Sequence, residues 1–237
     1  MLHIRRARAA ARPEPTHDRR GYRRSPVTLS SYRRGKAPPN KGRKFPAEPL
    51  TSAEVQALLR ACGDDMAGNR NRALIVLYWR CGLRNAEALA LREVDVDVEN
   101  GTVTVLHGKG DRRRVVAIDR EAVEMLRPWL HERAELGFGP ADPFVCVVEG
   151  PTRGQPLIEA YPRNLLKRLG EKAGLAKRIH PHGLRHTYAA SLLDAGVPIH
   201  YLRRMLGHSS IAITEHYADH VHPARVLQAL RELAWPD

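Results

Sequence analysis

The spacing of apolar positions predicts helices over most of the chain after residue 50. Thr51 and Glu54 have the spacing of a capping box, and apolar residues follow them at helical intervals. Residues 73–79 are apolar without interruption and lie between two arginines, so we expect a buried helix segment there. The predicted helices begin at Thr51 and then cover 70–80, 85–92 (with Asn85 as its cap), 120–136, 159–173, 182–195, 198–206 and 222–234.

Between residues 94 and 118 the apolar pattern changes from the helical period to a period of two. Valines alternate with aspartates over residues 94–98, and Asn100-Gly101 follows as a type I′ turn signal. The alternation resumes in two further segments, 103–105 and 115–118, separated by a second turn at 108–111. The expected fold class is therefore mainly α with a small three-stranded antiparallel sheet.

Positive charge is concentrated at the N-terminal end of the sequence. The 237 residues carry a net charge of +13, and residues 1–45 contribute +12 of it, with 14 Lys and Arg against two acidic residues. This segment also has five prolines and few apolar residues, so it cannot bury enough surface to fold alone. We interpret residues 1–47 as a basic, disordered DNA-binding arm. The alternative is a solvated tail that only keeps the protein in solution.

Cysteine spacing and hydropathy limit the classes of protein to which this chain can belong. Cys62, Cys81 and Cys146 are widely spaced and form no CxxC pair, which is typical of reduced thiols in a cytoplasmic protein. No apolar run approaches the roughly 18 residues of a membrane helix, and no secretory signal is recognisable. We therefore expect a cytoplasmic protein with no membrane partner, no cofactor and no metal.

Five segments carry residue types suited to chemistry on a phosphodiester. They are Gly82-Leu-Arg84-Asn-Ala-Glu87, Gly108-Lys109-Gly-Asp111, His180-Pro-His182-Gly-Leu-Arg185, Leu206-Gly207-His208 and Tyr217, which follows His208 by nine residues. In this order and at this spacing they resemble the tyrosine recombinases of the phage integrase family, over roughly residues 48–220. One such string alone is a weak signal, whereas five in order are specific.

The resemblance implies a catalytic role for six residues, which are Arg84, Lys109, His182, Arg185, His208 and Tyr217. Two guanidiniums, planar and always charged, suit the non-bridging oxygens of a phosphate in its transition state. Tyr217 would attack the phosphorus and form a covalent 3′-phosphotyrosyl link. By the same resemblance, His182 is the base, Lys109 protonates the departing 5′ oxygen, and His208 hydrogen-bonds the phosphate. The implied function is site-specific recombination of double-stranded DNA.

The resemblance also implies an organisation into parts. Residues 48–220 would form a tyrosine recombinase catalytic domain, the DNA breaking-rejoining enzyme fold. Residues 221–237 would form a C-terminal helix that docks on a neighbouring protomer in a homotetramer on DNA, or else packs on its own domain. Family members often carry a helical core-binding domain of about 100 residues before the catalytic domain. Here about 48 residues precede the match, so that domain is absent or the chain is truncated.

Rival interpretations remain open at this point. A type IB topoisomerase uses a similar set of residues, and a non-catalytic DNA-binding protein could keep the same fold. Taken singly, Arg84 and Tyr217 read as surface residues, and His182 with His186 as a metal pair, although no carboxylate lies between them as in HExxH. Tyr188 and Tyr201 are expected in the core. Only the joint pattern favours a recombinase.

Overall fold

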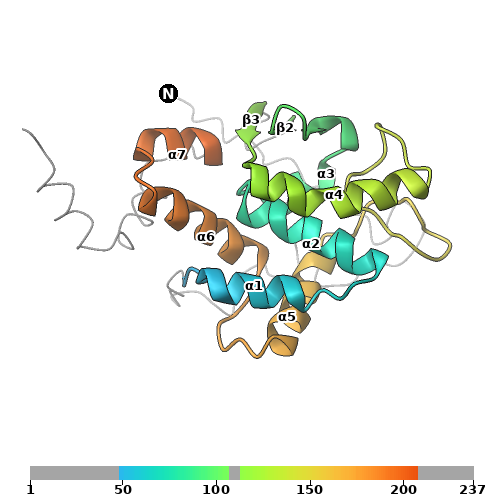
Figure 1. Ribbon diagram of the computed structural model, residues 1–237, viewed down its shortest axis with the longest axis horizontal. Helices are drawn as coiled ribbons and strands as arrows, with labels where there is room; N and C mark the ends of the chain where they lie inside the picture. The colour runs from blue at the N-terminus through green and yellow to red at the C-terminus, as the bar shows by residue number, and fades with distance from the viewer. Residues whose placement is uncertain (1–47, 107–112, 208–237) are drawn as a thin grey trace, which may run out of the picture. The chain divides into compact units, whose positions relative to one another are not determined.

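Helices dominate the computed structural model, which describes residues 48–106 and 113–207 (Figure 1). The α-helices are α1 (Ser52–Arg60), α2 (Met66–Trp79), α3 (Asn85–Ala90), α4 (Arg120–Glu135), α5 (Tyr161–Lys172), α6 (Pro181–Asp194) and α7 (Ile199–Leu206). The strands are β1 (Val96–Asp97), β2 (Thr102–Val105) and β3 (Arg114–Ala117), preceded by the 3-10 helix η3 (Glu93–Asp95). The predicted fold class is confirmed. The arm at 1–47 and the helix at 222–234 lie outside the described residues.

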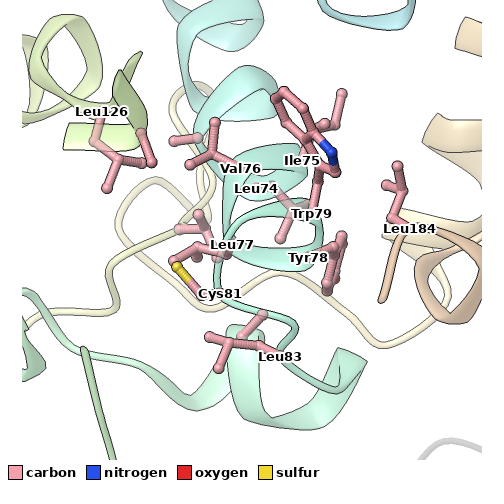
Figure 2. Packing of buried hydrophobic residues seen from close by; sticks show 14 of the residues in the cluster. Leu74, Ile75, Val76, Leu77, Tyr78, Trp79, Cys81, Leu83, Leu126 and Leu184 are labelled. Atoms are coloured by element: carbon pink, nitrogen blue, oxygen red, sulfur yellow. The ribbon is translucent and has the colours of Figure 1, made fainter. Parts of the chain in front are cut away.

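Helix α2 lies at the centre of the core, where it packs against α4 and α6. All of residues 73–79 are buried, as their uninterrupted apolar run predicts, because neighbours cover the helix on every side (Figure 2). The helix begins at Met66, four residues before the predicted start at residue 70. Asp65 caps it by accepting a 2.7 Å hydrogen bond from the Gly68 N–H. Within the described residues, no helix is both long and apolar enough to cross a membrane.

The sheet has the predicted antiparallel order β1-β2-β3. Val103 pairs with Val116, and both are fully buried, so one face of the sheet covers the core. The first strand is shorter than predicted. Residues 93–95 form η3 instead, because the Asp95 carboxylate accepts a hydrogen bond from the Arg92 backbone N–H at 3.0 Å and closes a tight turn. Val94, predicted to begin the strand, is 60% exposed in that turn.

Two side chains differ from expectation near the ends of helices. Arg84, rather than Asn85, is the N-cap of α3. The Asn85 side chain instead accepts a 2.7 Å hydrogen bond from the Tyr78 hydroxyl and donates to the Glu159 carbonyl, so it ties α3 to α2 and to the segment before α5. Tyr188 is buried as predicted, but the prediction for Tyr201 is wrong, since it is 55% exposed on α7.

Candidate active site

The turn between α2 and α3 requires a glycine. Gly82 has φ of +58°, in the left-handed region, and a Cβ there would lie 2.3 Å from Cδ1 of Tyr188. The tight turn places the carbonyl of Gly82 within hydrogen-bond distance of the Arg185 Nη1, which donates to it. The same turn brings Arg84 to the start of α3, only two residues later. Arg84, the first predicted catalytic arginine, is thus positioned by a left-handed backbone conformation at Gly82, which residues other than glycine adopt only at a cost in free energy.

Helix α6 carries the two central residues of the third motif. His180 caps it, and its Nδ1 accepts a 3.0 Å hydrogen bond from the Gly183 N–H. His182 and Arg185 are three residues apart on this helix. Arg185 is only 1% exposed, and its Nη2 donates to the Leu206 carbonyl at 2.5 Å. Arg185 therefore lies inside the domain, between the α2–α3 turn and the end of α7.

A buried carboxylate, Glu87, gathers three guanidiniums around it. Its Oε1 accepts from Arg84 Nη1 at 2.7 Å and from Arg114 Nη1 at 2.8 Å. Its Oε2 accepts from Arg114 Nη2 at 2.7 Å and lies 3.9 Å from Arg185 Nη1. The structure thus brings the two predicted catalytic arginines, Arg84 and Arg185, to one carboxylate.

The charge of this cluster suits an anionic ligand. Burial would raise the pKa of Glu87, but hydrogen bonds from Arg114 and from the Arg84 backbone N–H, together with the charge of Arg114, lower it to about 2. Glu87 is therefore ionised at neutral pH, and three guanidiniums around one carboxylate leave a net charge of +2. The Arg84 side chain is 28% exposed, so part of this positive charge is open to solvent.

His182 is held in its neutral form at physiological pH. His182 is exposed to solvent on one side, yet desolvation by neighbouring atoms lowers its pKa, and the charges of Arg185 and Arg84 lower it further. Its ring meets the ring of His186 edge-on, with centroids 4.2 Å apart. Among residues 48–106 and 113–207, no three His, Cys, Asp or Glu side chains are grouped so as to hold a metal ion. A neutral imidazole beside two arginines is able to accept a proton.

Known proteins share both this sequence pattern and this fold. Residues 48–223 match the model of the phage integrase family. The chain belongs to that family. Among curated relatives, the tyrosine recombinase XerC of Xanthomonas campestris pv. campestris (strain B100) is 36% identical over 194 residues, which cover 81% of this chain and 57% of that protein. XerD of Mycobacterium leprae (strain TN) is 35% identical over 203 residues, which cover 83% of this chain and 62% of that protein.

Solved structures of two recombinases have a similar fold. The XerA recombinase superimposes with a TM-score of 0.66 at 26% identity, covering 84% of this chain and 68% of that one. The XerH site-specific recombinase, in a post-cleavage complex with palindromic difH DNA, gives a TM-score of 0.62 at 29% identity, covering 80% of this chain and 53% of that one. The matched part of this chain spans less than two thirds of the length of the two curated relatives named above.

Three of the six predicted site residues belong to the described part of this integrase-family chain, namely Arg84, His182 and Arg185. Lys109, His208 and Tyr217 lie outside the described residues, so their roles stay predictions. In the sequence, Lys109 falls between β2 and β3, within residues 107–112, and His208 comes immediately after Gly207.

The sequence motifs give no role to Glu87 or Arg114, although both lie in or beside the segments that carry those motifs. Each nevertheless carries a signal in the sequence. Glu87 stands three residues after Arg84, a spacing that places an acidic side chain at the start of a helix. Arg114 falls on the same face of β3 as the buried Val116, where the alternation calls for an apolar residue. A charged residue on a buried face indicates a buried partner.

Proposed function

We propose that this chain is a site-specific DNA recombinase, which cleaves and rejoins double-stranded DNA through a covalent 3′-phosphotyrosyl intermediate. The observation that carries the proposal is the pair Arg84 and Arg185, held around Glu87 in a cluster of net charge +2, in a chain of the phage integrase family. A scissile phosphate gains negative charge in its transition state, and fixed guanidiniums stabilise that charge. The relatives called tyrosine recombinases support the same activity.

In the proposed reaction, the Tyr217 oxygen attacks the scissile phosphorus and its proton passes to His182. The bond between phosphorus and the 5′ oxygen breaks, and Lys109 supplies the proton that the departing oxygen takes. His208 hydrogen-bonds the phosphate together with the two arginines. The 5′ hydroxyl of a second DNA end then attacks the phosphotyrosine, which releases Tyr217 and joins the strands. The energy of the first bond is kept in the covalent link, so no nucleotide is hydrolysed.

The neutral state of His182 supports its part in this scheme. An imidazole that is already protonated cannot accept the phenol's proton, and an ordinary histidine is partly protonated near pH 6.5. Desolvation lowers the pKa of His182, and Arg185 and Arg84 add to the effect, so its neutral fraction at pH 7 is larger than that of a histidine with the ordinary pKa. Cleavage by this base would begin to fail only in more acidic solution.

The wider setting is part of the same proposal. We infer that the enzyme works in the cytoplasm as a homotetramer on DNA, with residues 221–237 docked on a neighbouring protomer. Residues 1–47 add non-specific affinity for the phosphate backbone through their excess of +12, which lies within residues 1–45. Mobile-element DNA is the proposed substrate.

Covalent capture tests the proposal even though the target sequence is not specified in advance. The purified full chain is mixed with sheared, nicked genomic DNA and denatured in detergent, and DNA that stays attached to protein is sequenced. A recombinase yields adducts at a common site, while Tyr217→Phe, which loses only the nucleophilic oxygen, yields none. Arg185→Lys keeps the charge but not the fork of donors, so its yield should fall more than tenfold, equivalent to about 1.4 kcal/mol.

Other outcomes would identify the rival functions. Adducts from Tyr217→Phe at the wild-type level would mean that another residue is the nucleophile. Adducts with relaxation of supercoiled plasmid, but no strand exchange between two duplexes carrying the captured site, would indicate a type IB topoisomerase. DNA binding without any adduct would indicate a non-catalytic DNA-binding protein.

A further inference from the structure

Strand β3 brings a charged side chain to the buried face of the sheet. The Arg114 side chain is 11% exposed, on the same face as the fully buried Val116. A guanidinium can be buried only where acceptors surround it. Arg114 has three such bonds. Nη1 and Nη2 donate to the two oxygens of Glu87 at 2.8 and 2.7 Å, and Nε donates to the Met205 carbonyl at 3.0 Å.

The bonds to Glu87 reach Arg84 through the same carboxylate. Glu87 Oε1 also accepts from Arg84 Nη1 at 2.7 Å, and Oε2 accepts from the Arg84 backbone N–H at 2.8 Å. Because Arg114 holds both oxygens, the carboxylate plane is fixed, and with it the direction from which Arg84 can bond. The positive charge of Arg114 also neutralises the negative charge of Glu87. Without Arg114, Arg84 and Arg185 alone would have to neutralise a buried carboxylate, and less positive charge would remain for a phosphate.

The third bond joins β3 to the end of α7. Three consecutive carbonyls there accept from three arginines in turn: Met205 from Arg114 at 3.0 Å, Leu206 from Arg185 at 2.5 Å and Gly207 from Arg84 at 2.9 Å. The last carbonyls of a helix have no partners within the helix and carry its negative partial charge, so cations stabilise them. The same three guanidiniums therefore bind both Glu87 and the end of α7.

We propose that Arg114 is a positioning residue for the phosphate-binding arginines. It neutralises Glu87 and fixes the end of α7, so that Arg84 keeps both its orientation and its charge for the scissile phosphate. This inference rests on the proposed recombinase function. Arg114 itself does not touch the phosphate; its effect passes through Glu87 and the Met205 carbonyl.

Two substitutions at this position and two substrates test the inference. Arg114→Met removes the guanidinium, and Arg114→Lys keeps a charge but cannot bond both Glu87 oxygens and the Met205 carbonyl. The substrate is a nicked duplex with the sequence found by covalent capture, with either a normal phosphodiester or a neutral methylphosphonate at the scissile position. A methyl group in place of a charged oxygen reduces the need for cationic stabilisation. The rate of covalent adduct formation is measured at saturating protein.

We expect Arg114→Met to cleave the phosphodiester about 100-fold more slowly than wild type, the scale of a misplaced catalytic group. On the methylphosphonate the ratio of wild-type to variant rate should fall to about tenfold or less. The neutral methylphosphonate has less need of the positive charge of Arg84, which Arg114 keeps available for the phosphate. Arg114→Lys should lie between wild type and Arg114→Met on the phosphodiester. Arg113→Met, which removes a positive charge from the adjacent exposed position, serves as the matched control and should cleave within about threefold of wild type.

The possible results separate this inference from the proposed function. A wild-type protein that forms no adduct contradicts the recombinase proposal, and the inference with it. If wild type forms adducts, three results overturn the inference alone: rates for both Arg114 variants within about threefold of wild type, equal losses on both substrates, or an equal loss for Arg113→Met. Equal losses on both substrates, with a lowered melting temperature, would mean that Arg114 only stabilises the fold. Should Arg114→Met fail to fold, the two-substrate comparison on Arg114→Lys decides.

Discussion

The backbone N–H of Leu50 donates a 2.9 Å hydrogen bond to the hydroxyl of Thr187, 137 residues further along the chain. Both residues are buried, and the Thr187 hydroxyl in turn donates to the Gly183 carbonyl at 3.1 Å. Thr187 lies on α6, two residues after Arg185. The segment that leads into α1 therefore holds the helix that carries His182 and Arg185.

Replacing Thr187 with valine should destabilise the protein although the shape of the side chain is kept. The change leaves the buried N–H of Leu50 without its acceptor, which costs about 1–3 kcal/mol of unfolding free energy. Denaturant unfolding of the purified protein measures the loss. Thr187→Ser, which retains the hydroxyl, should lose markedly less. Wild-type stability for Thr187→Val, with a clear loss for Thr187→Ser, would show that the methyl group, rather than the hydrogen bond, matters.

Gly82→Ala should be far more damaging than a matched glycine substitution on the surface. Gly82 and Gly137 both have positive φ, at +58° and +75°, but a Cβ at Gly82 would meet the Tyr188 ring, whereas a Cβ at Gly137 meets nothing within 4 Å. Gly137→Ala should cost about 1 kcal/mol for the backbone alone, and Gly82→Ala about 3 kcal/mol or more. Thermal melts of the two variants make the comparison, and similar midpoints would contradict it.

The cap of α6 predicts a pH dependence of stability. Desolvation lowers the pKa of His180 from its ordinary value of 6.5, and the charge of Arg178 adds to this effect, so the folded protein favours the neutral imidazole. Its Nδ1 must be unprotonated to accept from the Gly183 N–H. The stabilisation is therefore fully present above pH 6.5 and is lost as the pH falls through the lower, folded-state value.

His180→Asn provides the test, because asparagine also accepts a capping hydrogen bond but does not titrate. We expect wild type to lose unfolding free energy between pH 7.5 and pH 5, and the variant to lose less over that interval. A part of the loss should remain in the variant, since the pKa of His182 is also lowered, by desolvation and by nearby positive charges. The same pH dependence in both proteins would exclude His180 as its source.

Deleting residues 1–45 should flatten the salt dependence of non-specific DNA binding. Each phosphate contact contributes about −0.9 to the slope of log affinity against log salt, so contacts from half of the segment's 14 Lys and Arg would contribute about −6. Affinities of the full and shortened proteins at several salt concentrations give both slopes. Cleavage of pre-bound DNA should survive the deletion, because the six predicted site residues all follow Thr51. An unchanged slope would make the segment a solubilising tail.

Much of the fold follows from the sequence because apolar periodicity records which face of each element is buried. The prediction was weakest where polar side chains are buried. Arg70 and Asn71, 4% and 7% exposed, interrupt the apolar pattern of α2. They are buried because Arg70 donates to the Asn71 side chain and to the Cys146 carbonyl, a partner 76 residues away that local pattern cannot reveal.

The candidate site was predictable only in part for a related reason. Arg84 and Arg185 stand in recognisable strings, so resemblance is enough to find them. Glu87 and Arg114 owe their importance to each other, across 27 positions of sequence, and the strand that places Arg114 faces the helix that places Glu87 only after folding. A motif specifies residues along one segment, whereas the carboxylate that joins three arginines is a property of the tertiary structure.

The bonds of Arg84 also determine when the charge cluster can exist during synthesis of the chain. Arg84 donates to the carbonyl of Gly207, 123 positions later, and Arg114 and Arg185 donate to the two carbonyls just before it. A ribosome makes the chain from its N-terminus, so Arg84 and Glu87 emerge long before α7 does. Until α7 has emerged and docked, the three guanidiniums lack the carbonyls that hold them. A nascent chain therefore lacks the assembled cluster of three guanidiniums until the end of α7 has been made and has docked.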